Sequence, residues 1–364
     1  MPKLFVGNFS FEQTRNPANT LPTRLRRLDA ELASVWLAVA DEEDEILCAE
    51  PIDDEYWTRM QELGCPRVHP ISRDGLTNSR ARKVIPWGWS EEIRTIAVAV
   101  TISCDAPDQN VIWNTNSREF QFELARELGC LIPGETLIRS IEEIDDKLRR
   151  TGDWPAGWIL KANWGQSGRG QMSGVGLRDD PPFRDWVRRN LGEAGFLVLE
   201  PRLNAVSEYG IQWEVPRTGP PTRVGITELL SDRRGQYLGT TVLKSGDTPE
   251  LLHDAIVVQS RVAERLQLLG YFGPLGIDTM IYRDDSGMKV RPVQDINARW
   301  TMGRLALGWA AQLQSVGVGS WLHQSESPSD TAILLSPERV GSELVRHRHW
   351  WQPAASTTSL IQDT

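Results

Sequence analysis

The sequence predicts a mixed α/β and α+β protein with more than one packed unit. Its 364 residues exceed the length of an ordinary single domain, so two or three separate cores are expected. Up to about residue 110, short apolar runs alternate with helix-like stretches, a pattern typical of a largely parallel sheet. Two later stretches, residues 222–243 and 276–297, have the alternation and turn residues of antiparallel hairpins.

The first predicted unit covers residues 1–115. Apolar runs at Lys3–Val6, Val35–Ala40 and Glu45–Ala49 are interpreted as strands, and residues 54–63 as a helix. Because the strands alternate with helices, a Rossmann-like α/β domain is expected at the amino terminus.

Residues 116–157 are interpreted as a helix, a strand and a second helix that lead into the next unit. Apolar residues recur at helical spacing from Phe120 to Leu128, just before Gly129, which is a good helix stop. The domain boundary fits either at the start of this segment or at the glycine- and proline-bearing connection, residues 152–157.

The rest of the chain divides into two predicted subdomains and a tail. Residues 158–215 read as strand, glycine-rich loop, strand, helix and two strands, which suits a small α+β lid. Residues 216–330 hold the two hairpins and a long amphipathic helix at residues 248–269. Residues 331–364 are interpreted as a carboxy-terminal helix and a frayed tail.

Charge and cysteine content argue against several classes of protein. The net charge is -9, with 49 acidic and 40 basic residues interspersed, so no basic field favours nucleic acid; the basic run Arg346–His349 is interpreted as a solvated helix end. Four separated cysteines and five histidines without metal spacing predict neither a disulfide framework nor a zinc site. No signal core or membrane-length apolar segment is recognised. A soluble, cytoplasmic protein without a membrane partner is therefore expected.

A lysine at the end of an apolar strand precedes a glycine-rich loop. The lysine is Lys161, and the loop contains Gly165, Ser167, Gly168, Arg169 and Gly170. Glycines let backbone N–H groups turn toward a phosphate, while lysine and arginine supply compensating charge. The pattern is neither the dinucleotide fingerprint nor a Walker loop. A nucleotide triphosphate fits this loop, and an ordinary hairpin turn fits it about as well.

A second apolar strand, residues 196–203, leads into a hinge. Such a backbone can pair with an adenine edge, and a nearby carboxylate can accept hydrogen bonds from ribose hydroxyls. Glu200 and Glu208 are the candidate carboxylates. Taken alone, each is more simply explained as an ordinary surface acid.

The strongest pattern lies on the late hairpin. Asp278 is on one strand, and Asp295, Asn297 and Arg299 share one face of the other. Magnesium prefers hard oxygen ligands and usually binds through one or two carboxylates plus substrate phosphates. Arg299 could neutralise charge on a transferring phosphoryl group. The hairpin therefore predicts a magnesium site.

In this order and at these separations, the three patterns resemble the ATP-grasp superfamily of carboxylate-amine ligases, from about Asn116 to about Leu307. The resemblance implies an ATP-grasp fold, in which two α+β subdomains clamp ATP. It also implies that the preceding α/β domain helps to bind the carboxylate or the amine.

The resemblance also assigns roles to the nucleotide-binding residues. Lys161 would contact the α- and β-phosphates, and residues 165–170 would close over the triphosphate. Leu199 and Glu200 would lie at the adenine hinge, with Glu208 at the ribose. Arg118 stands where the family usually has a phosphate-binding lysine. The arginine keeps the positive charge and changes the hydrogen-bond geometry.

By the same resemblance, Asp278, Asp295 and Asn297 would hold two Mg²⁺ ions, with Mn²⁺ as an alternative metal. Asp295 replaces the family's usual glutamate and has a shorter side chain. Arg299 would stabilise an acyl phosphate, so Arg299 and Lys161 are the implied catalytic residues.

The implied activity is ATP-dependent joining of a small-molecule carboxylate to an amine or peptide through an acyl phosphate. Analogy also allows a homodimer. Two alternatives stay open, namely a kinase or phosphotransferase of the same fold and a non-catalytic nucleotide-binding module. The sequence does not specify the substrates.

Overall fold

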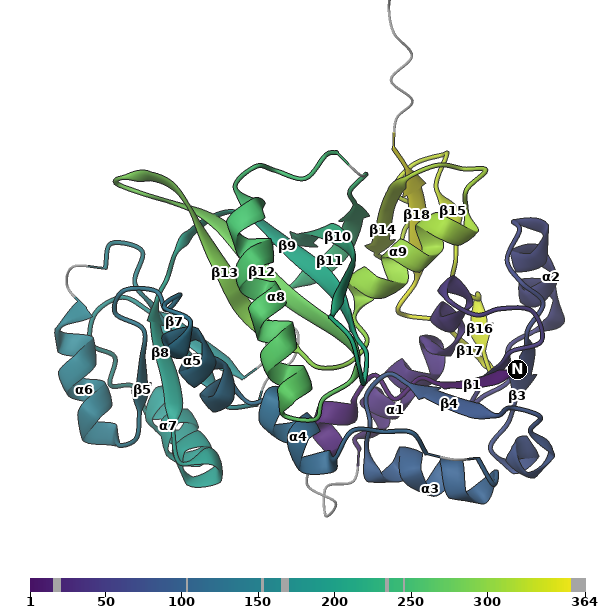
Figure 1. Cartoon of the computed structure of the whole chain (residues 1–364), viewed down its shortest axis with the longest axis horizontal. Helices are drawn as coiled ribbons and strands as arrows, with labels where there is room; N and C mark the ends of the chain where they lie inside the picture. Colours follow the sequence, from purple (N-terminus) through teal and green to yellow (C-terminus); the bar gives the residue numbers. More distant parts are fainter. Residues whose placement is uncertain are drawn as a thin grey trace, which may run out of the picture.

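The structure is a computed structural model, and it describes residues 1–15, 21–102, 104–151, 154–164, 170–232, 236–244 and 246–354. Figure 1 shows three assemblies side by side: the amino-terminal unit, a small lid sheet, and a long central sheet that continues into the carboxy-terminal strands. No helix among these residues is long and apolar enough to span a membrane.

The amino-terminal unit contains a four-stranded parallel sheet in the order β3-β2-β1-β4. Its strands are β1 (Lys3–Val6), β2 (Glu45–Leu47), β3 (His69–Ile71) and β4 (Lys83–Pro86). Its helices are η1 (Phe11–Thr14), α1 (Thr23–Glu31), η2 (Ala33–Ala38), α2 (Asp54–Glu62), η3 (Asp74–Asn78) and α3 (Glu91–Ala99). The predicted parallel α/β unit is confirmed. Because the chain adds β2 and β3 on one side of β1 and β4 on the other, the order reverses between β1 and β4.

One strand prediction in this unit is wrong. The apolar run Val35–Ala40 lies mostly in the 3₁₀ helix η2, whose residues are all buried. A short apolar run without alternation cannot distinguish a buried strand from a buried helix, because both bury every side chain.

The second assembly is a four-stranded antiparallel sheet in the order β5-β8-β6-β7. It consists of β5 (Thr136–Ile138), β6 (Trp158–Ala162), β7 (Gln171–Gly174) and β8 (Leu197–Pro201). The accompanying helices are α4 (Gln109–Thr115), α5 (Arg118–Glu127), α6 (Ile141–Arg149) and α7 (Pro181–Ala194). Helices α6 and α7 pack their buried residues Ile144, Leu148, Phe183 and Val187 on Trp158 and Leu160 of the sheet.

The third assembly is an eight-stranded antiparallel sheet in the order β13-β12-β9-β10-β11-β14-β18-β15. Its strands are β9 (Asn204–Val215), β10 (Thr222–Ser231), β11 (Tyr237–Val242), β12 (Gly273–Asp284), β13 (Gly287–Asn297), β14 (Gly319–His323), β15 (Ile333–Leu334) and β18 (His349–Pro353). Both predicted hairpins are confirmed, as β10–β11 and β12–β13. Helix α8 (Leu252–Leu268) packs on Ile211 and Ile277, and α9 (Met302–Gln312) contacts β9, β10, β11 and β14.

The interpretation of residues 331–364 as a helix and tail is wrong for the described part. Residues 331–354 contain β15, the small hairpin of β16 (Arg339–Val340) and β17 (Glu343–Leu344), and β18. The basic run at 346–349 is not a helix end. The backbone N–H groups of Arg346 and His347 donate to the buried Glu31 carboxylate, and the chain then enters β18.

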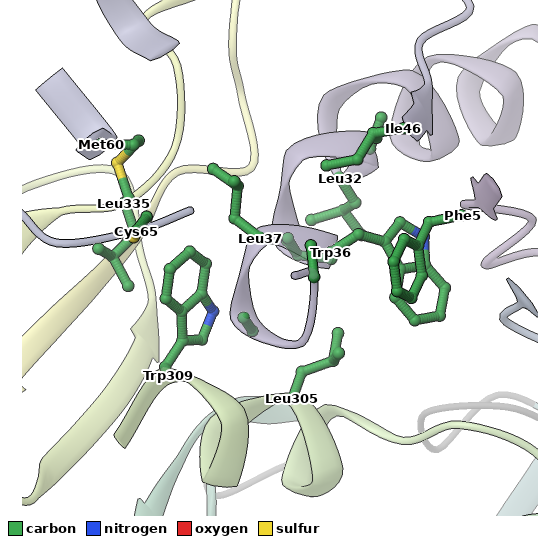
Figure 2. Packing of buried hydrophobic residues seen from close by; sticks show 14 of the residues in the cluster. Phe5, Leu32, Trp36, Leu37, Ile46, Met60, Cys65, Leu305, Trp309 and Leu335 are labelled. Carbon is green, nitrogen blue, oxygen red and sulfur yellow. The ribbon is translucent and has the colours of Figure 1, made fainter. Parts of the chain in front are cut away.

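One hydrophobic core joins the amino-terminal unit to the carboxy-terminal part of the chain. Figure 2 shows Leu305 and Trp309 of α9 packed toward Trp36 and Leu37 of η2. Helix α9 approaches η2 so closely that a Cβ on Gly308 would clash with the carbonyl oxygen of Ala38. The amino-terminal unit is therefore fixed against the sheet that carries the late hairpin, and its loops can reach that hairpin.

Candidate active site

The predicted metal ligands meet on the β12–β13 hairpin. Asp278 lies directly opposite Asp295, and Asn297 lies opposite Gly276. The side-chain amide of Asn297 donates to Asp278 Oδ2 at 3.3 Å. Because neighbouring Ile277 packs under α8, alternation places Asp278 on the opposite face of the sheet.

The electrostatics of this cluster favour a cation. Loss of hydration, with the negative charges of Asp295 and then Glu208, raises the pKa of the Asp278 carboxyl to about 8. Among the residues that the structure describes, Asp295 forms an ion pair with Arg118 alone, and the distance from Nη2 to Oδ2 is a long 3.9 Å. We call Asp278, Asp295 and Glu208 the acidic cluster. Its charges are poorly compensated, so a divalent cation bound by Asp278 and Asp295 would stabilise the cluster.

The donor set fits magnesium better than a metal held by protein alone. Within the described ranges, no group of three or more His, Cys, Asp or Glu side chains is arranged to hold a metal ion. Two aspartates and one amide leave most coordination positions to ligand oxygens and water, as is usual for Mg²⁺.

A second charged group lies where β6, β8 and β13 approach each other. Lys161 Nζ is 2.6 Å from Glu200 Oε1, and Arg291 Nη2 is 2.9 Å from Glu200 Oε2 and 3.0 Å from Glu135 Oε1. At most 11% of any of these four side chains is exposed. We call them the paired cluster. Burial alone would raise the pKa of Glu200, but Lys161 and Arg291 lower it to about 2.

The space beside the paired cluster is small. A cavity of about 30 Å³ is lined by side chains that include Arg118, Gln121, Lys161, Glu200 and Arg291. That volume holds about two water molecules. A nucleobase would need these side chains to move.

Arg118 connects the lid to the acidic cluster. Ser117 caps helix α5, and Arg118 donates from its backbone to Asn163 Oδ1 at 2.8 Å and from Nη1 to the Ala162 carbonyl at 2.7 Å. Its charge therefore lies between the end of β6 and Asp295.

The remaining candidate residues differ in where they lie and in whether the structure describes them. Gly170 adopts a positive φ of 78°, and its carbonyl accepts from the Ala162 N–H. Leu199 is 1% exposed inside the lid sheet, so its side chain is unavailable to a ligand. Glu208 lies beside the predicted metal ligands, where it accepts a hydrogen bond from the Gln294 amide at 2.9 Å. Gly165, Ser167, Gly168 and Arg169 lie outside the described residues.

Arg299 reaches toward the amino-terminal unit. Its Nε lies 2.5 Å from Glu12 Oε1, and its guanidinium lies 5.4 Å from the centre of the Trp87 ring.

Three residues of the site, Glu12, Glu135 and Arg291, were not predicted from the sequence. Arg291 gave one signal, a charge inside an apolar strand four residues before Asp295. Glu12 gave none, because its contact spans 287 positions.

Comparison with solved structures decides the fold. The biotin carboxylase domain of Hydrogenobacter thermophilus 2-oxoglutarate carboxylase superposes with a TM-score of 0.55 at 14% identity, over 96% of this chain and 86% of that one. Biotin carboxylase from Campylobacter jejuni gives 0.57 at 12% identity, over 97% and 87%. N5-carboxyaminoimidazole ribonucleotide synthetase from Thermus thermophilus gives 0.51 at 12% identity, over 97% and 94%. This chain has the ATP-grasp fold.

The ATP-grasp prediction is thus confirmed for the fold, including the preceding α/β domain. No protein-family model matches the sequence, and no curated protein matches it either. The likeness therefore fixes architecture alone, and the activity has to be argued from the residues of the site.

Proposed function

We propose that this protein is an ATP-dependent ligase that joins a carboxylate to an amine through an acyl phosphate. The observation that carries the proposal is the acidic cluster, with Arg299 two residues beyond Asn297 and Arg118 3.9 Å from Asp295. Oxygen ligands for Mg²⁺ and cations for phosphate thus converge on one face of the hairpin. The Hydrogenobacter domain was solved with MgADP and bicarbonate, which agrees with a nucleotide and a small anion on this fold.

Each polar group has a distinct role in the proposal. Asp278, Asp295 and Asn297 would hold Mg²⁺, or Mn²⁺, which neutralises phosphate charge when bound. Lys161 and Arg118 would orient the triphosphate from the lid side. Because Lys161 is paired with Glu200, its ammonium is held in place before a ligand arrives, which reduces the ordering cost of binding.

The reaction has two steps. A carboxylate oxygen attacks the γ-phosphorus, the bond to the β-phosphate oxygen breaks, and ADP leaves. The amine nitrogen then attacks the carbonyl carbon, the C–O bond to phosphate breaks, and phosphate leaves as the amine loses one proton. Arg299 would stabilise the negative charge of the acyl phosphate.

The proposal is tested by ADP release from ATP and Mg²⁺ with pooled amino acids and small carboxylates. Asp295→Asn should lower turnover at least about 100-fold, because it removes a metal ligand and nearly preserves shape. Asp285→Asn is the matched control, since Asp285 is exposed at the turn of the same hairpin.

The products distinguish the alternatives. ADP accompanied by an amide supports the ligase. ADP accompanied by a stable phosphorylated product would replace the proposal with a phosphotransferase, and ATP binding without turnover would replace it with a nucleotide-binding module.

A further inference from the structure

Glu12 lies where an open parallel sheet usually binds ligands. It belongs to η1, which follows the carboxyl end of β1, and Trp87 follows the carboxyl end of the adjacent β4. The strand order reverses between β1 and β4. Crevices outside the carboxyl ends of strands at such a reversal are the common ligand sites of this architecture.

The position of Glu12 is fixed by packing. Preceding Phe11 is fully buried and stacks on Trp113, with ring centres 5.3 Å apart and an interplanar angle of 12°. A Cβ on Gly88 would lie 2.6 Å from the Phe11 ring, so only glycine allows this approach. The side chain of Asn8 exchanges hydrogen bonds with the Gly88 backbone at 2.7 and 3.3 Å. The carboxylate is therefore preorganised.

Only one oxygen of Glu12 is used. Oε1 accepts from Arg299 Nε, and the two side chains are 10% and 11% exposed. Oε2 is buried and has no hydrogen-bond partner among the residues that the structure describes. A carboxylate is an acceptor only, and an unmet buried acceptor is costly. The free oxygen thus fits a ligand that brings an N–H or O–H group.

We propose that Glu12 Oε2 accepts an N–H of the amine substrate; this assignment rests on the proposed ligase function. Glu12 alone would favour the ammonium form of an amine, but the paired Arg299 charge offsets this effect, so the ion pair leaves the neutral, nucleophilic form accessible. The negative charge of Glu12 repels a carboxylate, which Arg299 attracts. The ion pair therefore sorts the two substrates to adjacent positions, with the amine on the side of the amino-terminal unit.

Two assays separate activation of the carboxylate from capture by the amine. Acyl phosphate formation is followed by positional isotope exchange in ¹⁸O-labelled ATP with Mg²⁺ and pooled small carboxylates, in the absence of an amine. Capture is followed by amide formation with the common amino acids and their amides as amines.

Glu12→Gln is the informative variant, because it can keep an acceptor for Arg299 while it replaces the free acceptor by an N–H₂ donor. It should raise the KM for the amine by roughly tenfold or more, with isotope exchange within about twofold of wild type. Glu12→Asp keeps the carboxylate and should recover part of the loss. Glu55→Gln, at an exposed position of the same unit, is the control.

An unchanged KM for the amine in Glu12→Gln would show that the amine does not bind through Oε2, and the inference would be wrong. An equal loss in isotope exchange and capture would also overturn it, because Glu12 would then only position Arg299. If wild type showed no isotope exchange, the proposed function itself would fail.

Discussion

The two charged groups of the site are built on opposite principles. The paired cluster has two cations and two anions, all within 3.0 Å of a partner and nearly excluded from solvent. The acidic cluster gathers three carboxylates, and among the described residues its shortest ion pair, between Asp295 and Arg118, is 3.9 Å long. Charge balance in the first favours a fixed geometry, whereas the imbalance in the second favours a bound cation. Removing one charge should therefore lower the free energy of unfolding when the charge belongs to the paired cluster and raise it when the charge belongs to the acidic cluster.

The largest expected effect on stability is in the paired cluster. Arg291→Met would leave Glu135 and Glu200 buried without their shared cation, so it should lower the free energy of unfolding by about 3–5 kcal/mol. Arg283→Met, which lies exposed on the same hairpin, should change it by less than about 0.5 kcal/mol. Urea unfolding measures both. Equal effects would mean that Arg291 stabilises the fold no more than an exposed arginine does, which would contradict the account of the paired cluster.

A smaller effect is expected from pH, and it has opposite signs in the two clusters. The pKa of Asp278 is raised to about 8 in the folded chain, so the unfolded chain loses this proton more readily. The contribution of Asp278 to the free energy of unfolding should therefore fall as the pH rises from about 4 to 8. The pKa of Glu200 is lowered to about 2, so its contribution is present above its ordinary pKa and is lost as the pH falls toward 2.

Asp278→Asn isolates the acidic part of this dependence. In buffer with a chelator, the variant should gain about 3 kcal/mol relative to wild type between pH 5 and pH 8, because the folded chain holds the Asp278 proton over most of this range. Unfolding at the two pH values tests this. A constant difference would mean that Asp278 is already ionised at pH 5.

The smallest effect is expected from Mg²⁺ alone. Millimolar Mg²⁺ should raise the melting temperature of wild type by a few degrees, because the ion binds the folded chain preferentially. The shift should disappear in Asp278→Asn and persist in Asp285→Asn. An equal shift in all three would place the ion elsewhere.

The sequence predicted that Asp278 and Asp295 lie together, whereas it assigned Glu208 to a ribose and gave no sign of the contacts around the cluster. Asp278 and Asp295 lie on strands joined by a short turn, so local alternation is enough to bring them together. The contacts Arg291–Glu135 and Arg299–Glu12 span 156 and 287 positions, and no local pattern specifies them. They depend on how separate units pack.

The errors in the fold have the same origin. The run Val35–Ala40 is apolar because η2 is buried on all sides between the amino-terminal sheet and α9. Residues 346–349 lead into β18, and contacts with Glu31 of α1, more than 300 positions away, hold this segment in place. At both places, tertiary contacts rather than the local secondary-structure preference of the residues determine the backbone conformation.

Calorimetric titration of MgATP tests most directly whether the acidic cluster is the functional one. Wild type and Asp285→Asn should bind MgATP, and binding should weaken strongly when a chelator removes the metal or when Asp278 and Asp295 are both changed to Asn. Binding that ignores both the metal and these two substitutions, or no binding by wild type, would contradict the assignment of this hairpin as the nucleotide and magnesium site.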